Sequence, residues 1–130
     1  MPGEIISGGQ HELSVAANHT IGEIIKPMIR EIHLFDTWIA GTTHLEDKYV
    51  LYTLEADEEL VLQRENNEFD SKAILVLKGD TRKLGYVPEK DNIIFARLMD
   101  AGKILKAKVG KIEDKDSWTK VTIGIYLVDL

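Results

Sequence analysis

The fold is decided by the stretch Arg64-Glu-Asn-Asn-Glu-Phe-Asp-Ser-Lys-Ala-Ile74. An alternating run ends just before it at Gln63 and the apolar run 73–77 closes it, so the stretch is predicted to be a polar loop between two strands. Asn and Asp side chains hydrogen-bond the backbone in such loops, so a structured turn needs no ligand. Phe69 stands between two acids, and its ring either plugs the core or is presented to a flat ligand.

The charged residues of this loop suggest two further interpretations. We expect the Arg64 guanidinium to pin the loop through a charge-assisted hydrogen bond to the carboxylate of Glu65 or Asp70. Glu65, Glu68 and Asp70 together could bind a cation or share a proton as acid and base. No nucleophile with a neighbouring base completes such a site, so we expect no enzyme activity and keep a metal-dependent hydrolase centred on Asp70 as an alternative.

The chain on either side alternates between apolar and polar residues in short runs that are typical of strands. We predict strands at residues 31–39, 48–54, 58–63, 73–78, 82–87, 105–109 and 121–127. The run 31–39 is apolar on both faces, which predicts an interior or barrel strand. Gly110 interrupts the alternation after residue 109, which predicts a bulge.

Helical signals occur in two places. One helix is predicted at residues 89–101, because Pro88 suits a first helical position and Gly102 suits the position after the last turn. A short helix is predicted between Thr20 and Pro27, after an arm at residues 1–17.

These elements imply a mainly β fold with two parts. Residues 1–30 form an arm with a short helix, and residues 31–130 form the domain. Six to seven short strands without a βαβ order predict a small OB-like antiparallel barrel with one helix at an end.

Composition favours one domain with an uneven charge. The chain has 130 residues, 44% of them hydrophobic, which is enough for a core. The net charge is −6, but residues 1–70 hold 4 Lys and Arg against 14 Asp and Glu, whereas residues 71–111 hold 10 against 4. The basic segment fits a local phosphate-binding face, or it only keeps the surface solvated.

Several kinds of chemistry have no sequence support. The chain contains no cysteine, and its four histidines lack the spacing of a zinc site. No phosphate-binding glycine loop is present, so we expect no cofactor. No stretch has the length of a membrane span or the pattern of a signal peptide, so we expect a soluble, cytoplasmic protein.

Binding chemistry remains. Single-stranded nucleic acid is held by rings that stack on bases and by cations that follow the phosphates. The candidate rings are His44, Phe69, Tyr86 and Trp118, of which the last two serve equally well as caps of the core. The candidate cations are Lys72, Lys83, Lys106 and Lys108. Alternation in 105–109 places Lys106 and Lys108 on the solvent face, which we expect to be the side of the binding groove.

The central loop and two flanking segments together resemble the HIRAN domain. That family carries an Arg-Glu-x-Asn-x-Tyr-Asp-x-x-Ala-Ile core, which resembles residues 64–74. A Gly-Tyr-Val-Pro segment follows at 85–88, and a motif similar to Gly-x-x-Tyr precedes the core at 41–44. The resemblance extends from about Ile32 to the C-terminus and implies the same OB-like fold.

The resemblance also implies a ligand. HIRAN domains are similar to OB modules that capture the 3′ end of single-stranded DNA, with two Tyr rings on the bases and an Asp on the free 3′ hydroxyl. The resemblance places Phe69 at the central Tyr and Asp70 at this Asp. It places Asn67 at the central Asn, and His44 at the first Tyr, preceded by Thr43.

The resemblance further places Trp118 near another stacking aromatic of the family. We therefore expect a module that binds single-stranded DNA or its 3′ ends in DNA repair or replication-fork processing. The alternative from a different class is a protein-interaction module that uses its acidic N-terminal half. The sequence leaves the oligomeric state open.

Overall fold

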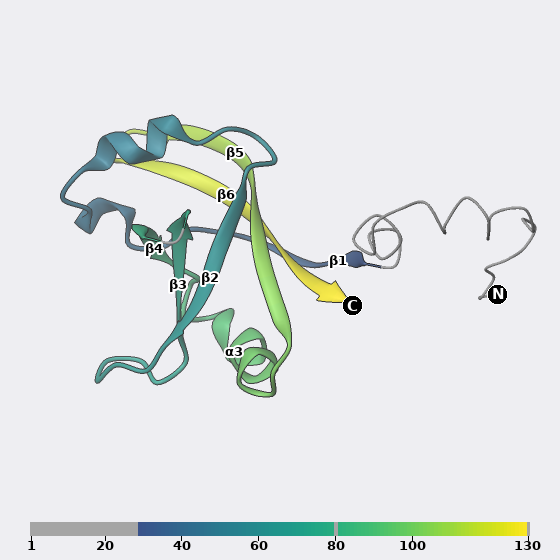
Figure 1. Cartoon of the computed structure of the whole chain (residues 1–130). Helices are drawn as coiled ribbons and strands as arrows, with labels where there is room; N and C mark the ends of the chain where they lie inside the picture. The colour runs from purple at the N-terminus through teal and green to yellow at the C-terminus, as the bar shows by residue number, and fades with distance from the viewer. Residues whose placement is uncertain (1–28, 80, 130) are drawn as a thin grey trace, which may run out of the picture. The chain divides into compact units, whose positions relative to one another are not determined.

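The computed structural model of the chain describes residues 29–79 and 81–129 (Figure 1). The predicted arm and the predicted short helix within residues 1–28 lie outside the described residues. In the described part, no helix has both the length and the apolar character that crossing a membrane requires.

Six strands form one antiparallel sheet in the order β1-β6-β5-β2-β3-β4. Their bounds are Arg30–Trp38 for β1, Glu59–Glu65 for β2, Ala73–Lys78 for β3, Arg82–Tyr86 for β4, Ile104–Lys115 for β5 and Trp118–Asp129 for β6. The strands curl into an OB-like barrel that is not fully closed, which confirms the predicted fold class. Figure 1 shows the helix α3 (Asn92–Asp100) near one end of the sheet.

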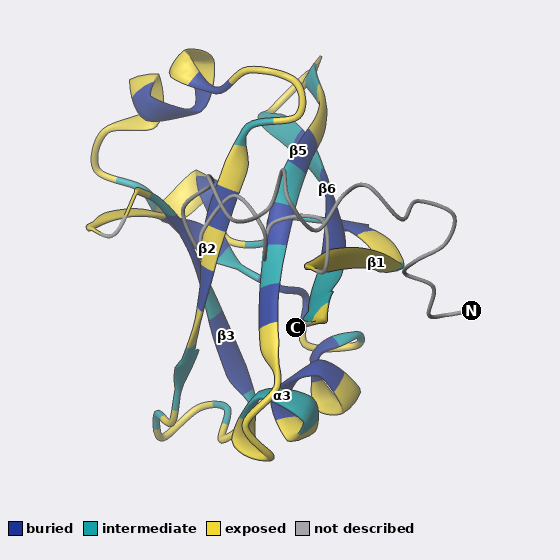
Figure 2. Cartoon of the chain, turned by 45° about the vertical axis from the view of Figure 1, so that its right-hand side comes forward, coloured by how far each residue is buried: buried dark blue, intermediate teal, exposed yellow. Residues whose placement is uncertain are grey.

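The core lies on the concave side of the curled sheet. Along β5, the buried residues Leu105, Ala107 and Val109 alternate with partly exposed lysines, and Figure 2 shows this alternation as dark and light bands. On β6, Ile123 and Ile125 are fully buried. The strands therefore contribute one apolar face each to a shared core, as the alternation in the sequence predicts.

An isolated β-bridge joins the segment after β1 to the end of β4, and these are the strands at the two ends of the sheet order. The Ala40 N–H donates to the Tyr86 carbonyl at 2.7 Å, and the Tyr86 N–H donates to the Ala40 carbonyl at 2.9 Å. Gly85 lies beside this bridge with φ +154°, and a Cβ built there would lie 2.3 Å from the Ala40 carbonyl oxygen. The approach of the two segments thus requires glycine.

Two local expectations are confirmed. The β5–β6 register shifts between Val109 and Ile112, so the predicted bulge lies at Gly110. Gly102 follows α3 with φ +94°, and its N–H donates to the Met99 carbonyl at 3.0 Å. The predicted C-terminal glycine of the helix is therefore in place.

The predicted strand at 48–54 is wrong, because Lys48–Thr53 forms the 3-10 helix η3. Asp47 precedes the helix and accepts a hydrogen bond from the Tyr49 N–H at 3.0 Å, which stabilises its first turn. The buried residues of η3 are the neighbours Val50 and Leu51, and not the alternate positions that a strand would bury.

Of the two positions predicted for the first strand, the barrel position is confirmed and the interior one is not. β1 lies at one edge of the sheet order, and its Ile32 and Phe35 side chains are about two-fifths exposed, at 41% and 40%. The Phe35 ring packs against Phe95 of α3, with 5.7 Å between ring centroids. The second apolar face of this strand therefore meets a helix in place of a neighbouring strand.

The predicted helix 89–101 begins later than expected. The Pro88 carbonyl accepts a hydrogen bond from the Asp91 N–H at 2.9 Å, which closes a turn before Asn92. Residues 88–91 are therefore a turn, and Pro88 is not the first helical residue.

We predict that Gly85→Ala lowers the free energy of unfolding by at least about 2 kcal/mol, because its methyl group overlaps the Ala40 carbonyl. Gly102→Ala is the matched control, since Gly102 also has a positive φ but a Cβ added there would have no atom within 4 Å. Urea unfolding of both variants measures the difference. Equal losses of stability would show that the close approach costs nothing.

Candidate nucleic-acid interface

The loop between β2 and β3 is built from two consecutive side-chain turns. The Asn67 side-chain oxygen accepts hydrogen bonds from the N–H groups of Phe69 at 2.9 Å and Asp70 at 2.8 Å. One Asp70 carboxylate oxygen accepts from the Lys72 N–H at 2.8 Å. The loop therefore holds its shape without a ligand, as its Asn and Asp content predicts.

The Asp70 carboxylate is also held from the side of the helix. Its second oxygen accepts a hydrogen bond from the Asn92 amide at 2.8 Å, and Asn92 is a buried residue at the start of α3. Each carboxylate oxygen has capacity for more than one hydrogen bond. Asp70 is thus fixed in direction and still able to accept a hydrogen bond from a ligand.

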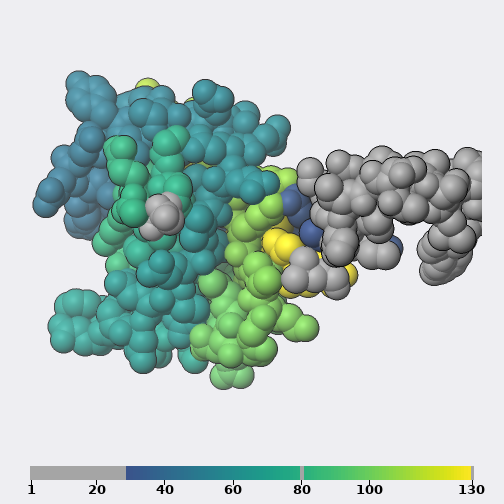
Figure 3. Space-filling view, viewed as in Figure 1, coloured from purple at the N-terminus to yellow at the C-terminus, as the bar shows by residue number. Residues whose placement is uncertain are grey.

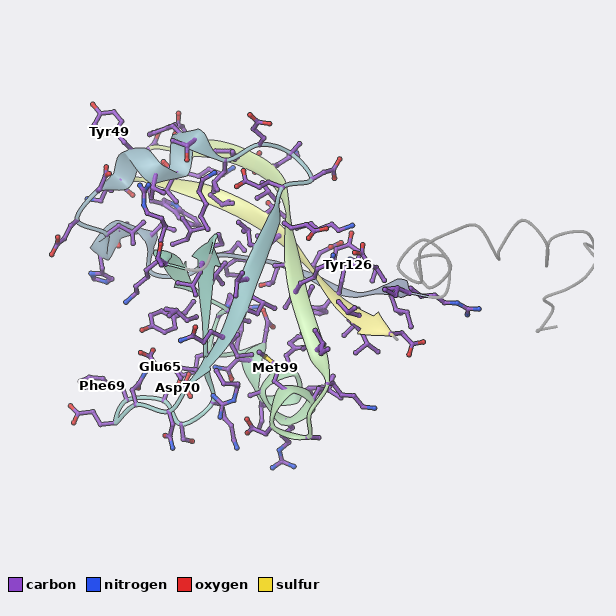
Figure 4. All side chains as sticks on the ribbon, viewed as in Figure 1. Tyr49, Glu65, Phe69, Asp70, Met99 and Tyr126 are labelled. Carbon is purple, nitrogen blue, oxygen red and sulfur yellow. The ribbon has the colours of Figure 1, made fainter. Side chains whose placement is uncertain are left out.

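Phe69 is presented to solvent. Its side chain is 85% exposed, and Figure 4 shows it pointing away from the barrel at the tip of the loop, close to Asp70. The interpretation of Phe69 as a plug of the core is therefore wrong. The two turns centred on Asn67 and Asp70 turn this residue outward.

Arg64 anchors the loop, but through partners other than those expected. Its guanidinium donates to the backbone carbonyls of Ala73 at 2.7 Å and Ser71 at 3.0 Å, and to both carboxylate oxygens of Asp100 at 2.8 and 3.2 Å. The predicted bond to the carboxylate of Glu65 or Asp70 is wrong: the carboxylate partner is Asp100 of α3, and Glu65 accepts from Arg64 only through its backbone carbonyl, at 3.2 Å. The hydrogen bond from Arg64 lowers the pKa of Asp100 although burial acts in the opposite direction.

One hollow lies next to this loop, and a second hollow shares Gly41 and Tyr86 with the first. The Phe69 hollow, of about 340 Å³, is lined by Ala40, Gly41, Asn67, Phe69, Asp70, Ala73, Tyr86, Val87 and Glu89. The His44 hollow, of about 690 Å³, is lined by Gly41, His44, Leu45, Glu46, Asp47, Val50, Arg82, Lys83 and Tyr86. Figure 3 shows the loop at residues 65–72 and the segment at residues 42–53 standing out from the lower and upper parts of one face.

Tyr86 is held in place between the two hollows. The Lys83 ammonium lies 4.7 Å from its ring centroid and 3.3 Å from its hydroxyl oxygen. A hydrogen bond to the Glu65 carboxylate, together with partial burial, raises the pKa of Tyr86. The Tyr86 ring is therefore held against Lys83 where it lines both hollows.

A third hollow lies around the turn of the β5–β6 hairpin. The Trp118 hollow, of about 400 Å³, is lined by Thr42, Thr43, Lys48, Leu51, Tyr52, Asp114, Lys115, Asp116, Ser117, Trp118 and Thr119. Thr43 and His44 are neighbours in η2 (Thr42–His44) but line different hollows. The predicted ring Trp118 is thus separated from Phe69 by the η2 segment.

The structure does not bring the predicted lysines of β5 to these hollows. Lys106 pairs with Glu31 and with Glu59, the latter at 2.8 Å, and Lys108 also pairs with Glu31. Burial disfavours charged Lys106, but hydrogen bonds to Glu31 and Glu59 raise its pKa. The expectation that both lysines stand free on the side of the groove is wrong, because β1 places Glu31 over them.

Lys72 is also turned away from the Phe69 hollow. Its backbone N–H supports Asp70, and its ammonium contributes to the lowered pKa of Asp100. Sequence reasoning missed three residues that the structure adds: Asn92, which orients Asp70, and Glu89 and Arg82, which line the hollows. No local pattern marks them, since they reach the site from other elements.

The assembled site has an exposed ring, a fixed carboxylate and a second ring along one face. Residues 32–128 match the family model of the HIRAN domain. The chain belongs to the HIRAN domain family. The HIRAN family is a family of nucleic-acid-binding modules, in agreement with the exposed aromatic residue and the hollows on this face. No curated protein matches the chain.

Solved structures are similar over most of the described HIRAN domain. The crystal structure of a protein from Lactobacillus plantarum is 26% identical, with a TM-score of 0.71, and the match covers 78% of this chain and 99% of that chain. The crystal structure of the HIRAN domain of human HLTF is 16% identical, with a TM-score of 0.60, over 75% of this chain and 78% of that chain. The second likeness shows the shared fold.

We predict that Arg64→Lys lowers the free energy of unfolding by about 1 to 3 kcal/mol, because an ammonium cannot satisfy three carbonyls and a bidentate carboxylate together. Arg97→Lys is the control, since Arg97 is an exposed arginine on α3. Thermal and urea unfolding measure both variants. An unchanged midpoint of unfolding for Arg64→Lys would show that the loop is held by its own side-chain turns alone.

Proposed function

We propose that this HIRAN domain binds the 3′ end of single-stranded DNA in the Phe69 hollow, without catalysis of its own. The proposal is carried by one observation: Phe69, 85% exposed, lies beside a carboxylate that two donors hold in a fixed direction. An exposed ring offers a stacking face to any base, and a fixed carboxylate accepts a hydrogen bond from a terminal hydroxyl. The family resemblance of the motif supports a role at DNA ends in repair or at replication forks.

The charges that line the Phe69 hollow favour a strand end that carries no phosphate. Asp70 and Glu89 line it, and none of its lining residues is a lysine or an arginine. A phosphate about 4 Å from one carboxylate is repelled by roughly 1 to 4 kcal/mol, depending on the local dielectric. The hollow is therefore suited to a neutral sugar terminus.

The neighbouring hollow adds positive charge and further rings beside the Phe69 hollow. Arg82 and Lys83 line the His44 hollow, and Lys83 is already positioned by the Tyr86 ring. His44 and Tyr86 supply rings of the kind that stack on bases. Because Tyr86 lines both hollows, a base in the Phe69 hollow contacts the Tyr86 ring in the proposed complex.

We predict that the protein binds an oligonucleotide with a 3′ hydroxyl at least about fivefold more tightly than the same oligonucleotide with a 3′ phosphate. Asp70→Asn keeps the shape of the side chain and removes its charge, so it should reduce this ratio towards one. Glu68→Gln is the matched control, because Glu68 is a neighbouring carboxylate that does not line the Phe69 hollow. Fluorescence anisotropy measures both affinities, and equal binding of the two ends by the wild type would refute capture of the end.

We predict that Phe69→Ala weakens binding to all single strands alike, by about 1 to 3 kcal/mol, which is the contribution of one stacked base. Its thermal stability should stay unchanged, because the ring is exposed. Tyr49→Ala is the control, since Tyr49 is 80% exposed on η3 and lines none of the three hollows. Affinity that is equally reduced in both variants would point to a general effect of surface aromatics.

The rival function is a protein-interaction module that uses the acidic N-terminal half. Binding to nucleic acid weakens steeply with salt because phosphate contacts release counterions. If the wild type binds no oligonucleotide at low salt, the rival function is favoured over the proposed one.

A further inference from the structure

Trp38, at the end of β1, has two ammonium groups beside its ring. Lys90 places its Nζ atom 4.7 Å from the ring centroid, and Lys120 places its Nζ atom 5.6 Å from the same centroid. These lysines come from the turn before α3 and from β6, so only the fold brings them together. We call Lys90 and Lys120, which lie beside the Trp38 ring, the Trp38 lysine pair.

The charge of this pair is only partly balanced. Lys90 donates to both carboxylate oxygens of Asp91 at 3.2 and 3.1 Å, and one of these oxygens also accepts a hydrogen bond from the buried Thr37 hydroxyl at 2.9 Å. Among residues 29–79 and 81–129, Lys120 forms no ion pair with a carboxylate within 4.0 Å. Two like charges near one ring repel each other, and an anion between them would relieve this repulsion.

The Trp38 lysine pair adjoins the Phe69 hollow. Ala40 and Glu89 line that hollow, and they lie two residues after Trp38 and one residue before Lys90. Ile39 is fully buried, so Trp38 and Ala40 project to the same side of an extended chain. A strand that leaves the hollow past Glu89 would therefore reach the two ammonium groups.

The other exit from the Phe69 hollow carries charges of both signs. The His44 hollow contains Arg82 and Lys83, but it also contains Glu46 and Asp47, and Asp47 lies 3.7 Å from Arg82. The Trp38 side has Lys90 and Lys120 beside Asp91, which is shared with Thr37, and Glu89, which lines the Phe69 hollow. Lys120, which has no carboxylate partner among the described residues, supplies the positive charge that attracts a phosphate to the Trp38 side.

We infer that the Trp38 lysine pair is a phosphate-binding site for the backbone of a single nucleic-acid strand whose end occupies the Phe69 hollow. This inference rests on the proposed function and adds to it the direction in which the strand runs. The Trp38 ring acts by holding two flexible side chains near each other, so that less freedom is lost when phosphates bind. It also explains how a chain of net charge −6 attracts a polyanion at one place.

The test compares the double variant Lys90→Gln/Lys120→Gln with the double variant Lys103→Gln/Lys111→Gln. Both lose two positive charges, but Lys103 and Lys111 lie at other positions of the β5 region and line none of the three hollows. Affinity for a 3′-hydroxyl oligothymidine is measured between low and moderate salt. Each lost phosphate contact on a single strand makes the slope of log affinity against log salt shallower by about 0.7. The slope for Lys90→Gln/Lys120→Gln should therefore be shallower than that of the wild type by about 1.4.

The ratio of affinities for 3′-hydroxyl and 3′-phosphate ends should stay unchanged in the Lys90→Gln/Lys120→Gln variant, because the pair lies outside the Phe69 hollow. A wild-type slope in this variant, with the ratio intact, would overturn the inference and leave the proposed function standing. Equal losses of slope in the two double variants would also overturn it, since net charge alone would then account for the effect. Absence of any binding by the wild type would instead remove the proposed function on which the inference rests.

Discussion

The approach of Ala40 to Gly85 is the constraint on which the rest of the structure depends. Two backbone hydrogen bonds between Ala40 and Tyr86 join the segment after β1 to the end of β4. The space they need exists only because residue 85 has no side chain. The same bridge holds the backbone of Tyr86, the residue that both hollows share, so one contact both joins the two segments and shapes the site.

The second constraint is the polar network that ties the central loop to α3. Arg64 reaches Asp100 at the end of the helix, and Asn92 at its start reaches Asp70. The loop is thus fastened at both ends of one helix, while its own Asx turns set the direction of Phe69. A side chain that is exposed for binding is therefore supported by a backbone that has few ways to move.

The local charge differs from one region of the surface to the next, and the net charge of the chain does not describe these regions. The Phe69 hollow is acidic, the β5 lysines are neutralised by Glu31, and unbalanced positive charge remains near Trp38 and Lys83. In the proposed function, this arrangement accommodates a single strand whose end carries a free hydroxyl and whose backbone is charged.

The sequence by itself determined the six strands of the sheet, the bulge at Gly110, the end of the late helix and the loop that carries Phe69 and Asp70, but it also predicted a strand where η3 lies. These features follow from alternation, glycine and Asx chemistry within a few residues, which a local pattern records. Only the tertiary structure decided the partner of Arg64, the neutralisation of Lys106 and the gathering of Lys90 and Lys120 at Trp38. Each of these depends on residues far apart in the chain, and the distance between two such side chains is set by the packing of whole elements, about which the local sequence carries no information.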